Sequence, residues 1–285
     1  MLEDFKRAWT IAKMCWNVLR LDKELLAFPL LSLITCGLLL AGVVGPLWVS
    51  GQLEAVLEFV AGSEEEGSGL VAFAFGFAVY FMVCFVMIFF NAALIACAKI
   101  RFAGGDPTVA DGLRASIQRL PQIFVWALTT SFVGYFLSQM ANKEKGIGKY
   151  VFAILGAGWA IASFFVVPVL VSEKVGPIAA LKKSVIVIKK TWGELLIAEV
   201  GMSVLVTVLI VFPTMLFVFL ALLILEFVPF APVVSFSIFV FAAIWVFALS
   251  LAYSTLSAIL RTALYLYATE GCIPKYFDPD VIRNP

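Results

Sequence analysis

The sequence predicts an all-α polytopic membrane protein with six transmembrane helices and three interfacial amphipathic helices, each of which precedes a helical hairpin. The first observation is composition: 63% of the 285 residues are hydrophobic and only 14% are charged, which excludes an ordinary soluble domain. The second is that the charged residues gather in a few segments separated by long apolar runs. The third is that a basic segment with helical periodicity occurs three times. We therefore treat residues 1–285 as a single membrane domain.

The apolar runs define the spans. A helix needs about 20 apolar residues to cross a hydrocarbon core of roughly 30 Å. Six runs meet this requirement: 25–49, 70–98, 122–140, 150–171, 195–225 and 233 to about 267. The first has the character of an uncleaved signal anchor. The second and sixth are longer than a span requires, so we expect them to carry Lys99, Arg101 and Arg261 to the inner interface.

The basic residues orient the spans. Lysine and arginine are retained on the cytoplasmic side of a membrane, and here they are dense before the first span, in the second loop and in the fourth loop. The first loop carries five glutamates and no base, and the fifth loop carries no base. Lys143, Lys145 and Lys149 of the third loop go against this trend. The majority predicts that both termini are cytoplasmic.

The three basic segments repeat one pattern. Their apolar positions fall on one stripe at 100° per residue: Phe5, Trp9, Ala12 and Trp16; Leu113, Ile117, Leu120 and Phe124; Leu181, Val185, Ile188 and Trp192. Basic residues occupy the flanking faces. We expect each helix to lie flat on the inner leaflet, with its stripe in the acyl boundary and its bases toward anionic lipid. This predicts pseudo-repeats at about 1–104, 105–172 and 173–270, followed by a short cytoplasmic tail, 271–285.

This pattern selects the candidate lipid-facing or partner-facing residues. They are Lys6, Arg7, Lys13, Trp16, Arg114, Arg119, Lys182, Lys183, Lys189, Lys190 and Trp192.

Few polar residues lie inside the apolar runs, and Asn91, Glu199 and Arg261 are the candidates for an intramembrane polar site. Ionisable groups in a bilayer are costly and are often functional. The alternatives are an interhelical hydrogen bond for Asn91 and an ion pair between Glu199, placed about a turn inside the fifth span, and Arg261.

Prolines and small residues complete the description of the spans. Pro168 and Pro213 lie inside the fourth and fifth spans, where proline kinks or breaks a helix. Small residues spaced four apart favour close helix packing; they are Gly37, Ala41 and Gly45 in the first span and Gly158 and Ala162 in the fourth.

Several classes of function lack the residues that they need. The chain has no histidine, and its five cysteines have no paired spacing, so we expect neither a metal site nor a disulfide framework. There is no phosphate-binding loop, nucleophile elbow or paired base for a serine. We therefore expect no catalysis, no cofactor and no nucleic-acid partner.

Four stretches carry a resemblance to a known family: "FFNAALIACAKIRFAGGDPTVADGL", "GAGWAIASFFVVPVLVSEKVGPIAALKKS", "TWGELL" and "LYLYATEGCIPKYFDPDVI". Over essentially its whole length the chain resembles a bacterial family of six-span membrane proteins of unknown function. The segment after the fourth span more distantly resembles the membrane domain of some bacterial glycerophosphodiester phosphodiesterases, although this chain has no histidine to serve such an active site. The resemblance implies a multi-pass protein of the bacterial inner (plasma) membrane and no particular activity.

Two functions follow as hypotheses. The first is a non-enzymatic protein that acts at the cytoplasmic leaflet, where its basic amphipathic helices organise lipid or dock a partner. Its expected partners are membrane lipids, anionic by charge complementarity, with a protein partner or a second copy of the chain left open. The alternative is a transporter or channel for a small or lipid-like solute, motivated by the repeat, the intramembrane prolines and Asn91.

Overall fold

The computed structural model describes residues 2–56, 68–143, 147–190, 199–227, 231–271 and 274–277. These residues form helices and their connections, and no β-strand occurs in the described ranges. Six helical segments are long and apolar enough to cross a membrane: Lys23–Val49, Leu70–Phe102, Leu120–Asn142, Ile147–Ser172, Gly201–Ile224 and Val233–Glu270. The predicted all-α, six-span class is therefore confirmed.

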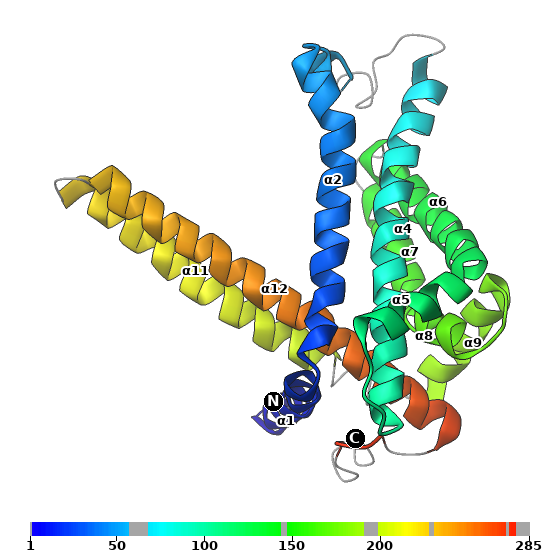
Figure 1. The fold of residues 1–285 in the computed structure, drawn as a ribbon. Coiled ribbons are helices and arrows are strands. Elements are labelled where there is room, and N and C mark those ends of the chain that lie inside the picture. The colour runs from blue at the N-terminus through cyan, green and yellow to red at the C-terminus, as the bar shows by residue number, and fades with distance from the viewer. Residues whose placement is uncertain are drawn as a thin grey trace. The chain divides into compact units, whose positions relative to one another are not determined.

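The elements follow one another in the predicted order, in which a helix precedes two long helical segments (Figure 1). They are α1 (Leu2–Leu21), η1 (Lys23–Leu26), α2 (Ala27–Val49), α4 (Ser68–Phe102), α5 (Val109–Gln118), α6 (Leu120–Lys143), α7 (Ile147–Ala162), α8 (Val166–Ser172), α9 (Pro177–Lys190), α11 (Gly201–Phe227) and α12 (Ala231–Glu270). Residues 195–198 of the predicted fifth span lie outside the described residues.

The contacts divide the chain into two compact units. The first comprises Met1–Leu26, Ile100–Asp106 and Lys190–Pro285, and the second comprises Ala27–Lys99 and Pro107–Lys189. This division follows contacts in space and not the pseudo-repeats, which stay a prediction.

In the first unit, α1 packs on the hairpin of α11 and α12. The side chains of Ala8, Ile11, Cys15 and Val18 are buried along one face of α1, at the spacing of a helix face. The helices approach closely where α11 begins, because a Cβ atom added to Gly201 would lie 2.5 Å from the Cβ of Ala8. Only glycine fits there without displacing α1.

The helix α11 continues through Pro213 without a break. Proline has no N–H, so the carbonyl of Leu209, four residues earlier, loses its helical partner. The indole N–H of Trp245 on α12 donates to this carbonyl, with Nε1 3.1 Å from the oxygen. A neighbouring helix thus satisfies the freed carbonyl, as a bilayer requires, and α11 is not broken at Pro213.

In the second unit the fourth span is interrupted, because α7 ends at Ala162 and α8 begins at Val166. Pro168 cannot donate to the carbonyl four residues before it, which agrees with the predicted break. The backbone N–H of Phe165 donates instead to Oγ of Ser184 on α9, at 3.0 Å in a buried setting. Phe165, Val166 and Leu170 are themselves fully buried, so protein covers the interrupted backbone.

Aromatic rings line the contact between α4 and α6 in the same unit. Phenylalanines recur every four residues on α4, with centroids 6.2 to 6.5 Å apart; they are Phe73, Phe77, Phe81, Phe85 and Phe89. Rings of α6 meet this ladder edge-on, for example Phe124 against Phe81 at 5.4 Å. Edge-to-face pairs of this kind stabilise packing beyond the area they bury.

The three glycines predicted to pack helices closely have no close neighbour within their own unit. A Cβ atom added to Gly37, Gly45 or Gly158 meets nothing within 4 Å. The close approach occurs instead at Gly112 of α5, where an added Cβ would lie 2.6 Å from the Phe28 ring and 2.7 Å from Sγ of Cys97. The four-residue spacing of small residues therefore did not identify Gly112, where the neighbouring side chains leave no room for a Cβ atom.

Candidate functional site

The candidate sites are three separate helix faces, the outward faces of α1 in the first unit and of α5 and α9 in the second. The geometry of each face depends on how the opposite face of the same helix is held. On α5, Gly112 and Ser116 are buried. The Ser116 hydroxyl donates to the carbonyl of Phe89 on α4 at 3.1 Å. Sγ of Cys97, also on α4, lies 3.3 Å from the carbonyl of Thr108, as a thiol donor. These contacts fix the rotation of α5 about its axis.

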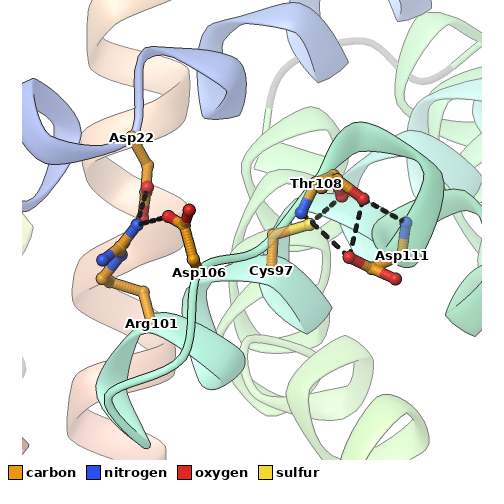
Figure 2. A network of polar contacts seen from close by, with 6 residues as sticks. All are labelled: Asp22, Cys97, Arg101, Asp106, Thr108 and Asp111. Atoms are coloured by element: carbon orange, nitrogen blue, oxygen red, sulfur yellow. Dashed lines mark hydrogen bonds and ion pairs between the residues drawn. The ribbon is translucent and has the colours of Figure 1, made fainter.

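A capping box fixes the start of α5 (Figure 2). The hydroxyl of Thr108 accepts from the backbone N–H of Asp111 at 3.2 Å, and the Asp111 carboxylate accepts from the backbone N–H of Thr108 at 3.0 Å. This reciprocal arrangement satisfies two donors that a helix start leaves without partners. The hydrogen bonds from Thr108 hold the pKa of the Asp111 carboxyl below its usual value, because they favour the ionised form.

The helix α9 packs against the protein through one face, on which Ala180, Ser184, Val187 and Ile188 are buried. The Lys183 ammonium pairs with the Glu173 carboxylate at 2.5 Å. Lys183 thus serves partly as an internal partner, whereas Lys182 on the neighbouring position is exposed.

An ion-paired cluster joins the end of α1 to the last turn of α4 and the following loop, all within the first unit (Figure 2). The Arg101 guanidinium donates through Nε and Nη2 to the two carboxylate oxygens of Asp22, and Nη2 also lies 2.5 Å from Oδ1 of Asp106. The side chains of Asp22 and Arg101 are 5% and 13% exposed, whereas Asp106 is 93% exposed. Asp22 is therefore buried, Arg101 is half-buried, and the third partner is at the surface.

The structure brings two of the three predicted intramembrane residues together. Oε1 of Glu199 accepts from Nη2 of Arg261 at 3.0 Å and from Oγ of Ser257 at 2.6 Å. The predicted ion pair is thus confirmed. Residues 191–198 lie outside the described residues, and Glu199 lies in a π-helical turn directly before α11, so its placement a turn inside the fifth span stays a prediction.

Asn91 lies on α4 in the second unit and is half-buried. Its side chain forms no hydrogen bond with the part of the chain that the structure describes, so the expected interhelical bond is not found there.

The outward face of α1 differs from the expected separation of basic and apolar faces. Trp9 and Trp16 are both 44% exposed, and Lys13 is exposed between them, with Nζ 5.5 Å from the centroid of the Trp9 ring. Basic and aromatic side chains therefore share one face, while a second apolar face of α1 is buried against protein. Ala12 of the predicted stripe is only half-buried.

Exposed apolar and basic residues are mixed on the other two helices as well. On α5, Arg114 is exposed together with Ile117, and the exposed Phe124 follows on α6. On α9, Lys182 and Lys189 are exposed together with Ile178 and Ile186. Such faces suit a membrane surface, since long basic side chains reach headgroups while apolar neighbours enter the acyl boundary.

The remaining candidates divide into three groups. Lys190 is exposed, whereas Arg119 is half-buried. Trp192 lies outside the described residues, as do the side chains of Lys6 and Arg7.

No metal or disulfide chemistry is found in the described ranges. No group of three His, Cys, Asp or Glu residues there could hold a metal ion. Cys15, Cys36, Cys84 and Cys97 form no disulfide, and Cys272 lies outside the described residues.

Comparison with known proteins gives one match. The model of a family of unknown function, DUF6159, matches residues 70–274. No curated protein matches the chain. No solved structure matches it either.

Proposed function

The chain belongs to the family of unknown function DUF6159, and from that premise we propose that it is a non-enzymatic protein which binds anionic lipid at the cytoplasmic leaflet of the bacterial inner membrane. The proposed binding surfaces are three separate ones, the outward faces of α1, α5 and α9. One observation carries the proposal: exposed bases occur together with exposed large apolar residues on α1 and α9, and Arg114 is exposed together with Ile117 on α5, while the opposite face of each helix is buried.

The exposed basic residues contribute additively to the free energy of lipid binding. A lysine or arginine near an anionic surface contributes about 1 kcal/mol, and the attraction decays within a Debye length. Lys182, Lys189 and Lys190 are exposed on α9, so their combined contribution is about 3 kcal/mol. Ile178 and Ile186 add apolar contact on the same helix.

Neutralising α9 tests the proposal. The full-length variant with Lys182→Gln, Lys189→Gln and Lys190→Gln is reconstituted in vesicles with spin-labelled phosphatidylglycerol or phosphatidylcholine, and quenching of tryptophan fluorescence gives the relative association of each lipid. We expect the preference for phosphatidylglycerol to fall in the variant and to be screened by salt in the native chain.

The matched control is neutralisation of Lys143, Lys145 and Lys149, which removes the same charge from the loop predicted to face outward. This control variant should leave the preference for phosphatidylglycerol at the inner leaflet unchanged. Equal preference in the native chain and the α9 variant contradicts lipid binding. If the α9 variant instead loses only a protein partner in a pull-down, docking of that partner is the role of this surface.

Transport of a small or lipid-like solute is the second candidate, and the half-buried Asn91 favours it because its side chain has no hydrogen-bond partner in the described ranges. A polar group in a bilayer normally has a partner or a function. Against transport, the interrupted fourth span is covered by buried Phe165 and Val166. Solute flux into vesicles that disappears in Asn91→Leu would support transport, and flux equal to that of empty vesicles would contradict it.

A further inference from the structure

The helix α1 has two faces with different partners. One face, with Ala8, Ile11, Cys15 and Val18, is buried, and α1 packs against α11 and α12. Because Gly201 allows the backbone of α11 to approach Ala8 closely, the rotation of α1 about its axis is fixed. The opposite face is therefore held in one direction, away from the hairpin.

The outward face is cationic and aromatic. Trp9, Lys13, Trp16 and Arg20 are exposed on it, at the spacing of one helix face. Residues 5–21 contain four bases and no acid, so no internal carboxylate of this stretch neutralises the face. Lys13 is positioned over the Trp9 ring, an arrangement that holds the ammonium beside an aromatic surface suited to headgroup depth.

We infer that this outward face is a binding site for the phosphate headgroup of an anionic phospholipid, and that lipid bound there holds α1 on α11 and α12. The inference rests on the proposed function only in that the protein meets anionic lipid. It adds that one of the three helices couples lipid binding to a contact inside the protein.

The coupling follows from thermodynamic linkage. When α1 is packed on α11 and α12, which we call the seated state, Trp9, Lys13 and Trp16 face the same direction. When α1 has left the hairpin, which we call the released state, its orientation is not fixed. A ligand that binds the seated state better shifts the equilibrium toward that state by its differential affinity. Loss of Lys13 should reduce the shift about fivefold, the factor that corresponds to one basic residue at an anionic surface.

Cys15 reports the seated state directly. It is fully buried in the face of α1 that packs on the hairpin, where a maleimide cannot reach it. Burial also raises the pKa of its thiol, which disfavours the reactive thiolate while α1 is packed. The nearby carboxylate of Glu199 adds to this effect. Alkylation of Cys15 therefore measures how often α1 leaves the hairpin.

The experiment measures the rate at which N-ethylmaleimide modifies Cys15, by mass spectrometry of its peptide, in full-length protein reconstituted in phosphatidylcholine with and without phosphatidylglycerol. We expect phosphatidylglycerol to slow the modification in the native chain. In the variant with Lys13→Gln and Trp16→Ala, both on the outward face, this slowing should decrease at least fivefold. Free glycerol phosphate in phosphatidylcholine vesicles should not slow it, since the site takes a membrane lipid.

Two further variants separate the outcomes. Gly201→Ala should speed the modification of Cys15 in either lipid, because the added Cβ displaces Ala8. If the rate is unchanged in this variant, Cys15 does not report the packing of α1 on the hairpin, and the inference that lipid stabilises this packing is overturned. The α9 variant should keep the lipid effect on Cys15. If phosphatidylglycerol still binds the protein but does not slow modification, the inference about α1 is overturned while the proposed function stands. If phosphatidylglycerol shows no preferential binding to the native protein, both are overturned.

Discussion

At the scale of single residues, Pro213 and Trp245 solve a problem that a bilayer creates. Proline leaves the Leu209 carbonyl without its helical donor, and no water is present in hydrocarbon to replace it. Trp245 supplies the donor from α12. The hydrogen bond therefore joins the two helices of the hairpin at the point where Pro213 removes a backbone hydrogen bond from α11.

Replacing Trp245 with phenylalanine should destabilise the protein by about 1 kcal/mol, the range measured for interhelical hydrogen bonds in membranes. The loss should shrink when Pro213→Ala is also present, because the alanine introduced there supplies a backbone N–H to the Leu209 carbonyl. Reversible unfolding in mixed micelles measures both. Trp48→Phe, at an exposed position of α2, is the control. Additive effects of the two substitutions would contradict the assignment.

Asp22 and Arg101 form the second residue-scale feature, a two-pronged pair between a buried carboxylate and a half-buried guanidinium. Removing Arg101 leaves the buried Asp22 carboxylate without its compensating charge, which costs about 3 kcal/mol. Arg101→Gln should destabilise by that amount, and adding Asp22→Asn should recover part of it.

The matched control is Asp106→Asn, because Asp106 pairs with the same arginine but is 93% exposed. Its effect should stay below about 1 kcal/mol. Thermal unfolding of the purified protein in detergent gives all four values. Equal losses for Asp22→Asn and Asp106→Asn would show that burial does not set the energy of this cluster.

The residue-scale predictions differ in origin. The pairing of Glu199 with Arg261 could be predicted because few ionisable groups lie in the apolar runs, and each needs a partner there. The Asp22–Arg101 pair could not, because 79 positions separate the residues and several other charges lie near each of them in sequence.

At the scale of elements, the periodicity of α1, α5 and α9 predicted amphipathic helices but not which apolar face meets protein. On α1 the predicted stripe contains Trp9 and Trp16, which are exposed, whereas Ala8, Ile11 and Cys15 form the buried face. A helix that lies between protein and lipid has one apolar face toward each. Sequence periodicity detects both faces together and does not tell which one contacts protein. Small side chains mark the protein side, since Ala8, Ser116 and Ser184 are all fully buried.

The start of α5 gives an element-scale prediction with a defined pH dependence. The pKa of the Asp111 carboxyl is lowered in the folded state by hydrogen bonds from Thr108. A lowered pKa means that the cap stabilises the helix above the ordinary carboxyl pKa and loses this contribution as pH falls through the folded value. Hydrogen-exchange protection of α5, corrected for the intrinsic pH dependence of exchange, should therefore fall on acidification.

Asp111→Asn should flatten this pH dependence. Thr108→Ala should lower protection of α5 at neutral pH by a factor that corresponds to about 1 kcal/mol, as for other N-cap losses. The amides of α6 serve as the internal control. A pH profile that is the same in the native chain and Asp111→Asn would assign the acid sensitivity to another group.

At the scale of the whole molecule, the number and positions of the spans could be predicted because a bilayer imposes one length and one polarity on every crossing segment. In the run 150–171, Pro168 predicted the break in the helix. The hydrogen bond from the Phe165 N–H to Ser184 of another helix could not be predicted in this way. Helix partners could not be predicted in this way. The packing of α1 on α11 and α12 joins elements from opposite ends of the chain, and a local sequence pattern carries no information about contacts over that separation.

Orientation is the remaining whole-molecule property that sequence predicts, and single-cysteine labelling tests it. Lys23→Cys and Lys182→Cys are placed on the predicted cytoplasmic side and Lys149→Cys on the outer side; all three positions are exposed. In intact cells a membrane-impermeant maleimide should modify only Lys149→Cys, and permeabilisation should make the other two reactive. The physical reason is that bases near the membrane resist translocation, and both sites expected inside lie in segments dense in bases. The native chain, whose four described cysteines lie buried or half-buried, is the background control. Labelling of Lys182→Cys from outside would reverse the orientation and move the basic faces of α1, α5 and α9 to the outer leaflet.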